Sequence, residues 1–125
     1  MKEKELFNWL KDRFLPDLET TEQFDYKDAY SKKHDLYIEL KCRKTHYDDL
    51  LIEKIKWDKL IAHRNVRYIN WTPIGVFSFN LHNMLEPTWQ QREMPKTTEF
   101  DINDKIIKTI GYLDVERYAI KIANF

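Results

Sequence analysis

Hydrophobic residues recur at helical spacing near the start of the chain and predict an amphipathic helix over residues 3–15. Its apolar face comprises Leu6, Phe7, Leu10 and Phe14. Acidic residues in its first turn suit the positive end of the helix dipole, and Pro16 ends the segment.

The segments that follow alternate between apolar and polar residues, which is typical of β-strands. Strands are predicted over residues 23–31 and 35–43, and the short polar break SKKH between them indicates a β-hairpin. Two registers stay open, because the turn is Lys32-Lys33 or Lys33-His34. The first places Asp28 opposite Tyr37, whereas the second places it opposite Glu39.

A second helix is predicted over residues 46–62, with Thr45 and Asp48 resembling a capping box at its start. The apolar positions that share its face are Tyr47, Leu50, Leu51, Ile55, Ile61 and Ala62. Two more strands are predicted in the segments NVRYINWT and GVFSFNL, paired through the turn TPIG.

The last third of the chain has a weaker pattern. The segment NMLEPTWQQREMPKTTEFD indicates a loop or short helix, KIIKTIGYL a strand or a helix, and DVERYAIKI a last helix capped by Asp114. The predicted fold is α/β or α+β, with a mixed sheet flanked by helices. The order is αββαββ plus a C-terminal tail whose structure the pattern does not decide, in one domain over residues 1–125.

Composition narrows the class of protein. The 125 residues are 42% hydrophobic, and 21 Lys or Arg balance 21 Asp or Glu, so any nucleic-acid contact surface must be local. The start is too charged for a secretory signal, and no apolar run approaches the about 20 residues of a membrane helix. With a single cysteine and no internal disulfide, we expect a cytoplasmic protein without a membrane partner.

The hairpin carries the candidate chemistry. Glu39 and Lys41 lie two apart on one strand and therefore point to one face, about 6.6 Å apart at Cα, while Leu40 points into the core. Either register of the turn brings Asp28 to the same face as a cross-strand neighbour. Two facing carboxylates repel, and a divalent cation with oxygen ligands relieves the repulsion. We expect Mg²⁺, replaceable by Mn²⁺, and hydrolysis of a phosphodiester, with Lys41 positioned beside the attacking water.

Asp28, ten intervening residues and the run Glu39-Leu40-Lys41 resemble the PD-(D/E)XK nuclease motif. The order of elements over about residues 3–81 is similar to the restriction-endonuclease-like core of that family, and the general look of the chain resembles small phage-type endonucleases. The resemblance implies that Asp28, Glu39 and the Leu40 backbone carbonyl bind the metal and that Lys41 is the catalytic lysine. Lys occupies position 27, where the family motif has Pro.

Other acidic residues are alternatives for the metal carboxylate. Asp17 belongs to the only literal Pro-Asp pair, and Asp25 shares the face of Glu39 if the turn has an odd length. Asp35 lies on the strand of Glu39 but about 13 Å away at Cα. Glu5, or Glu3, is an accessory candidate from the first helix.

Positive charge concentrates around the hairpin, since residues 27–44 hold six Lys or Arg against three acidic residues. Such a local patch suits phosphate groups. The candidate nucleic-acid contacts are Lys32, Lys33, Arg43 and Lys44, with Lys54 and Lys56 from the second helix. Lys105, Lys108 and the segment MPKTTEF are further candidates for a nucleic-acid groove.

The sequence therefore predicts a Mg²⁺-dependent endonuclease that cuts DNA and recognises backbone or DNA structure rather than base sequence. A homodimer would supply the reach that a small domain lacks. The alternative is a non-catalytic nucleic-acid-binding or assembly protein on the same fold. A third reading is a structural interaction domain in which Glu39 and Lys41 form a surface ion pair.

Overall fold

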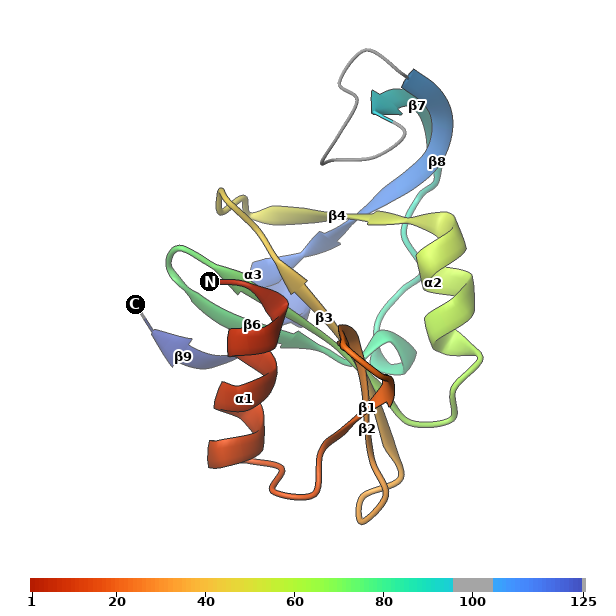
Figure 1. The fold of residues 1–125 in the computed structure, drawn as a ribbon. Coiled ribbons are helices and arrows are strands. Elements are labelled where there is room, and N and C mark those ends of the chain that lie inside the picture. The colour runs from red at the N-terminus through yellow and green to blue at the C-terminus, as the bar shows by residue number, and fades with distance from the viewer. Residues whose placement is uncertain (96–104, 125) are drawn as a thin grey trace.

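The computed structural model, which describes residues 1–95 and 105–124, has a mixed α+β fold with two sheets (Figure 1). The six-stranded sheet has the order β1 (Glu19–Glu22), β2 (Asp25–Ser31), β3 (Leu36–Cys42), β5 (Val66–Thr72), β6 (Gly75–Phe79) and β9 (Ile120–Asn124). The three-stranded sheet has the order β4 (Asp49–Glu53), β8 (Lys105–Asp114) and β7 (Gln90–Pro95). The helices are α1 (Glu3–Arg13), α2 (Lys54–Ile61), α3 (Val115–Tyr118) and the short 3₁₀ helix η1 (Leu81–Asn83).

Helix α1 covers one face of the six-stranded sheet, as the apolar pattern of its sequence predicts (Figure 1). Leu6 and Leu10 pack with Ile38 and Leu40 of β3, and all four side chains are buried. Burial of this kind stabilises a helix more than its intrinsic propensity does. Because side chains alternate along a strand, the neighbours of Ile38 and Leu40 on β3 point to the opposite face.

That opposite face packs against α2 and the three-stranded sheet. Trp57 and Leu60 of α2 are buried there with Tyr37 of β3 and Leu50 and Ile52 of β4. The second core therefore fixes α2 and β4 over the same face of β3 that carries Glu39 and Lys41.

The β2–β3 hairpin forms with the second of the two predicted registers. Asp28 pairs with Glu39 and Ser31 pairs with Leu36, which leaves residues 32–35 as the loop. A four-residue loop, longer than the predicted two-residue turn, is closed by Asp35 at a φ of 48°. Strand β3 then pairs with β5 in parallel and in continuous register, which makes the sheet mixed, as predicted.

The predicted helix over residues 46–62 is wrong in its first half. Residues 49–53 form strand β4, and α2 begins only at Lys54. Leu50 and Ile52 are buried whereas Asp49 is exposed, a period of two that a helical reading of the same apolar residues obscured. Pairing with β8 supplies the backbone partners of this strand, so Thr45 and Asp48 do not cap a helix.

The C-terminal part forms strands rather than helices, apart from one short turn. The segment KIIKTIGYL lies in β8, and Asp114 caps the four-residue helix α3 through a bond from the Arg117 N–H at 3.1 Å. The chain then enters β9 at the edge of the six-stranded sheet. The predicted loop over 83–101 contains β7, and its part from residue 96 lies outside the described residues.

None of the helices in the described part of the chain has the length and apolarity that a membrane crossing requires.

Candidate functional site

Asp28 and Glu39 are direct cross-strand neighbours. The Tyr37 N–H donates to the carbonyl of Asn65, just before β5, and the N–H of Arg43, just after β3, donates to Trp71 O in β5, so the odd-numbered peptide groups of β3 face β5. The pair formed with Asp28 is therefore of the non-hydrogen-bonded type, in which facing side chains approach most closely.

The two carboxyl groups are buried to different degrees and polarise each other. The Asp28 side chain is 18% exposed and that of Glu39 is 4% exposed. Burial favours the neutral form of Asp28, but the neighbouring Glu39 carboxyl and Tyr37 hydroxyl outweigh it and lower the pKa of Asp28. Burial and the contact with Asp28 together raise the pKa of Glu39 to about 7. The pair therefore shares a proton near neutral pH.

The backbone carbonyl of Leu40 lies next to this pair. Leu40 lines the groove described below although its side chain is buried in the core under α1, so it is the backbone that faces the groove. The β2–β3 register ends at Asp28, and the N–H of Lys27 donates to Asp25 Oδ1 at 2.9 Å. Asp25 thus accepts from the N–H that would come next in the ladder opposite the Leu40 carbonyl.

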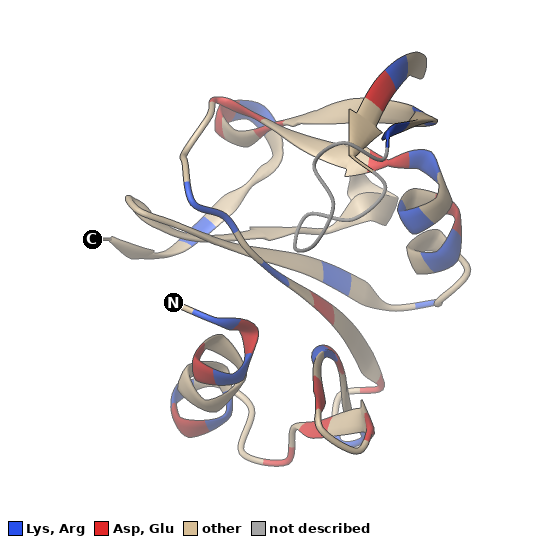
Figure 2. Cartoon of the chain, turned by 45° about the horizontal axis from the view of Figure 1, so that its top comes forward, with Lys and Arg blue, Asp and Glu red and all other residues tan. Residues whose placement is uncertain are grey.

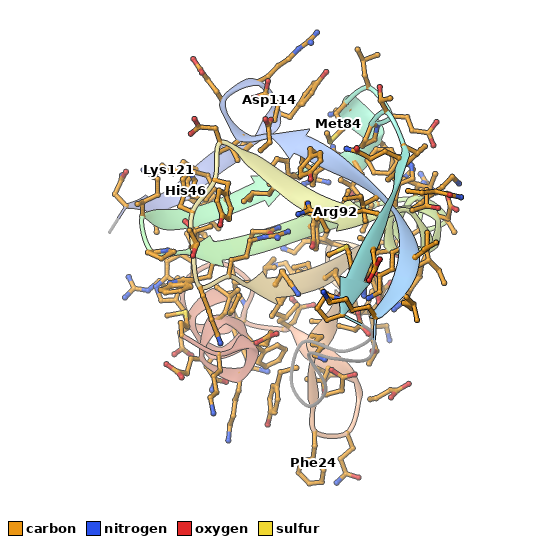
Figure 3. All side chains as sticks on the ribbon, turned by 90° about the horizontal axis from the view of Figure 1, so that it is seen from above. Phe24, His46, Met84, Arg92, Asp114 and Lys121 are labelled. Atoms are coloured by element: carbon orange, nitrogen blue, oxygen red, sulfur yellow. The ribbon has the colours of Figure 1, made fainter. Side chains whose placement is uncertain are left out.

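A groove of about 980 Å³ runs between the two sheets, with Glu39 and Lys41 on one wall. The opposite wall comes from β4, β7 and β8 and includes the exposed ring of Tyr47 and the pair Arg92–Tyr112, bonded at 3.0 Å. Figure 3 labels Arg92 beside this wall, with Phe24 at the distant tip of the β1–β2 hairpin. The basic residues that line the groove are Lys27, Lys41, Arg43, Lys56, Arg92 and Lys108.

Lys41 forms no hydrogen bond or ion pair with residues in the described ranges 1–95 and 105–124. Although the residue as a whole is exposed, burial of its ammonium group lowers the pKa of Lys41, and the positive charge of Arg43 adds to this effect. An uncommitted ammonium with a lowered pKa is suited to orient water or to neutralise developing negative charge.

Comparison with known proteins does not decide the function. No protein-family model, curated protein or solved structure matches the chain significantly. The chemistry must therefore be argued from the geometry of the site.

The residues around Asp28 and Glu39 fit a hard divalent cation. Asp28 Oδ1 is buried and accepts no hydrogen bond from the described part of the chain, and a buried carboxylate oxygen in this state is costly unless a cation or donor meets it. Two carboxylates and one backbone carbonyl are the oxygen donors that Mg²⁺ uses, with water completing its shell. Within the described residues no group of three His, Cys, Asp or Glu converges, so the oxygen donors that this pair and Leu40 offer to such an ion would be the ones available.

The alternative acidic residues have local structural roles. Asp17 accepts bonds from Ser31 Oγ at 2.8 Å and from the Lys33 N–H at 2.9 Å, which holds the hairpin loop. Asp35 accepts from the Tyr30 hydroxyl at 2.7 Å. Asp25 bonds to the backbone of its own strand, as described above.

Of the two acidic candidates on α1, Glu3 lines the groove, whereas Glu5 is exposed and does not line it. Helix α1 thus contributes a residue to the rim, but from its first position.

Of the basic residues predicted to contact nucleic acid, those at the hairpin loop and after β3 lie at the surface, whereas Arg43 bonds within the fold. Lys32 and Lys33 lie at the hairpin loop, and Lys44 is exposed just beyond β3. Arg43 is committed to the fold: its guanidinium donates to Asn70 Oδ1 at 2.6 Å and to Leu51 O at 2.7 Å, which ties β4 to the six-stranded sheet.

Helix α2 brings two lysines to the carboxylates, and one of them was missed. Lys54 pairs with Asp58 at 2.8 Å, as the i,i+4 spacing allows, and does not reach the site. Lys56 lies 3.1 Å from Glu39 Oε1, and Lys59, which sequence reasoning left out of the candidate site residues, lies 3.5 Å from Asp28 Oδ2. The signal was present, because the two lysines are three apart on one helical face.

The shared proton predicts a pH-dependent stability for the metal-free protein. Because the folded state raises the pKa of Glu39 from 4.5 to about 7, it binds more protons than the unfolded chain between these values. The free energy of unfolding should fall on the order of 2 to 3 kcal/mol from pH 5 to pH 8. The lowered pKa of Asp28 acts only at more acidic pH and leaves this window unchanged.

Urea unfolding in EDTA at pH 5, 6, 7 and 8 measures this effect, and the difference between wild type and Glu39→Gln isolates the contribution of Glu39. The matched control is Glu22→Gln at an exposed position of β1, which should keep the wild-type slope. Equal slopes for wild type and Glu39→Gln would show that Glu39 holds no extra proton in the folded state.

Proposed function

We propose that this protein is a Mg²⁺-dependent nuclease that hydrolyses DNA phosphodiester bonds on a PD-(D/E)XK core. The observation that carries the proposal is the direct pairing of Asp28 with Glu39, with Lys41 two residues further on the same face. The order of α1, the hairpin, α2 and the parallel strand β5 supports it, and β4 is an addition before α2.

Each residue then has a distinct role. Asp28, Glu39 and the Leu40 carbonyl would hold the ion, which when bound supplies Lewis-acid activation of the phosphodiester and of water. Burial of Glu39 keeps its carboxylate in one position and excludes bulk solvent from it. Lys41 neutralises charge that develops on the phosphate and orients the attacking water.

Recognition is assigned to the DNA backbone or to DNA structure rather than to base sequence. Lys41, on the same face of β3 as Glu39, is suited to phosphate, which every sequence shares. The groove carries acidic as well as basic residues, and charges of both signs are interspersed over the ribbon in Figure 2. Affinity should therefore depend on local fit at the site more than on a uniformly positive surface.

The test is incubation of supercoiled and branched DNA, and of an RNA of the same sequence, with Mg²⁺. We expect cleavage of DNA that requires Mg²⁺ or Mn²⁺ and stops on addition of EDTA. Cleavage that survives both EDTA and the substitution Lys41→Ala would contradict the proposal.

One observation favours a second candidate, a nucleic-acid-binding or assembly protein without hydrolysis. Lys56 and Lys59 lie within ion-pair distance of Glu39 and Asp28, as in a purely structural ion-pair network. This candidate predicts salt-sensitive binding of nucleic acid that neither divalent ions nor Glu39→Gln alters.

A further inference from the structure

The two lysines of α2 surround the carboxylate pair from one side. Lys56 Nζ lies 3.1 Å from Glu39 Oε1, and Lys59 Nζ lies 3.5 Å from Asp28 Oδ2 and 3.9 Å from Glu39 Oε1. Two ammonium groups therefore lie against the two carboxyl groups, where a divalent cation would carry the same positive charge.

The helix itself is fixed, whereas the lysine side chains have room to move. Trp57 and Leu60, which directly follow the two lysines, are 3% and 0% exposed in the core. The side chains of Lys56 and Lys59 are 33% and 50% exposed. A change in the site can therefore turn the ammonium groups outward without displacing α2, because lysine stems are flexible.

The ammonium groups and a divalent ion compete for the same oxygen atoms. Like charges a few ångströms apart repel strongly in a partly buried site, where water screens them less than in solution. The lysines also leave Asp28 Oδ1 without a hydrogen-bond partner among residues 1–95 and 105–124, so they satisfy the pair incompletely.

Resting on the proposed function, we propose that Lys56 and Lys59 hold the place of the metal ion in the metal-free protein and turn to the phosphates of the nucleic acid when a divalent ion binds. The carboxylates then never lie uncompensated in the protein interior. The released ammonium groups emerge beside the groove, which Lys56 already lines.

This exchange predicts effects of opposite sign for one pair of substitutions. In Lys56→Met/Lys59→Met, Mn²⁺ no longer competes with ammonium groups, and its affinity should rise at least tenfold. Nucleic-acid affinity in the presence of Ca²⁺ should fall, and the slope of log K against log salt should decrease by about 2, roughly 0.9 for each phosphate that a lysine no longer neutralises. A merely structural role of the lysines would not raise metal affinity.

Calorimetric titration of EDTA-stripped protein with Mn²⁺ measures the first effect. The matched control is Lys54→Met on the same helix, whose ammonium group pairs with Asp58 and lies over the Trp89 ring rather than at the carboxylate pair, and its Mn²⁺ affinity should equal that of wild type. Fluorescence anisotropy with a labelled oligonucleotide in Ca²⁺, over a salt series, measures the second. If the double variant does not fold, Lys59→Met, which retains the contact of Lys56 with Glu39, should give a smaller change of the same sign.

The outcomes separate this inference from the proposed function. Tighter Mn²⁺ binding with weaker nucleic-acid binding supports the exchange, and so does Mn²⁺ binding by the double variant alone. Unchanged or weaker Mn²⁺ binding in the lysine variants overturns the exchange but leaves the metal site of the wild type standing. Absence of Mn²⁺ binding in wild type and variants alike overturns both.

Discussion

Replacement of Glu39 by Gln is expected to reduce the rate of DNA cleavage by about 10³-fold or more, because several kcal/mol of metal-dependent stabilisation are lost. Gln has nearly the same shape, but its neutral amide is a poor ligand for Mg²⁺ and cannot complete the negatively charged pair with Asp28. The rate should be measured at saturating Mg²⁺ with a DNA that wild type cuts.

Two controls test whether the loss of cleavage comes from the Glu39 carboxylate itself. Glu22→Gln changes an exposed carboxylate on β1 of the same sheet and should leave the rate unchanged. Urea unfolding of Glu39→Gln should show a folded protein at the pH of the assay, since the variant no longer holds a buried ionisable group at position 39. Wild-type cleavage by folded Glu39→Gln would mean that the chemistry lies elsewhere.

Replacement of Lys41 by Ala is the second large effect, with an expected decrease in kcat of roughly 10²- to 10⁴-fold, the usual range for loss of a group that assists proton transfer or charge development. Lys41 has no intramolecular partner within the described residues, so its removal leaves no partner group unpaired. The free energy of unfolding should therefore change little, and Mn²⁺ affinity should not decrease.

Further variants at Lys41 and at a nearby lysine distinguish an electrostatic role of the Lys41 ammonium group from a role in proton transfer. Lys41→Arg keeps the positive charge but cannot release a proton, so partial activity would assign Lys41 an electrostatic role. Lys44→Ala, three residues along, should raise KM at most and leave kcat unchanged. A full wild-type kcat for Lys41→Ala would contradict the assignment.

The sequence could predict the hairpin because its strands alternate and the break between them is short and polar. Both predicted registers put Asp28 on the face of Glu39. The reason is that the two turns have the same even length, so the same alternate side chains of the two strands point to one face. The choice between them depended on a four-residue loop closed by Asp35 and held by Asp17, which are tertiary contacts that no local pattern reveals.

The second helix shows why strong periodicity can mislead. Residues 49–53 have apolar side chains that fit both a helix and a strand, and pairing with β8, more than fifty residues away, decides for the strand. The opposite wall of the groove could be predicted only in part. Lys108 was a candidate for such a groove and does line it, but Tyr112 and Arg92 come from strands whose position depends on that long-range pairing.

The pairing of Asp28 with Glu39 could be predicted from the sequence, but the groups that surround the two carboxylates could not. The spacing of Asp28, Glu39 and Lys41 predicted a shared face, and β2 and β3 bring Asp28 and Glu39 together. Burial of Glu39 and the position of the ammonium groups of α2 depend on how three elements pack. Those features set the pKa values of the pair and its ability to bind a cation.

The most direct test of the central claim is calorimetric titration of metal-free wild type and Glu39→Gln with Mn²⁺. A paired carboxylate site predicts one ion bound per chain by the wild type and a loss of that binding in Glu39→Gln. Binding that is the same in both proteins, or that is absent from the wild type and from Lys56→Met/Lys59→Met, would contradict the claim that Asp28 and Glu39 form a metal site.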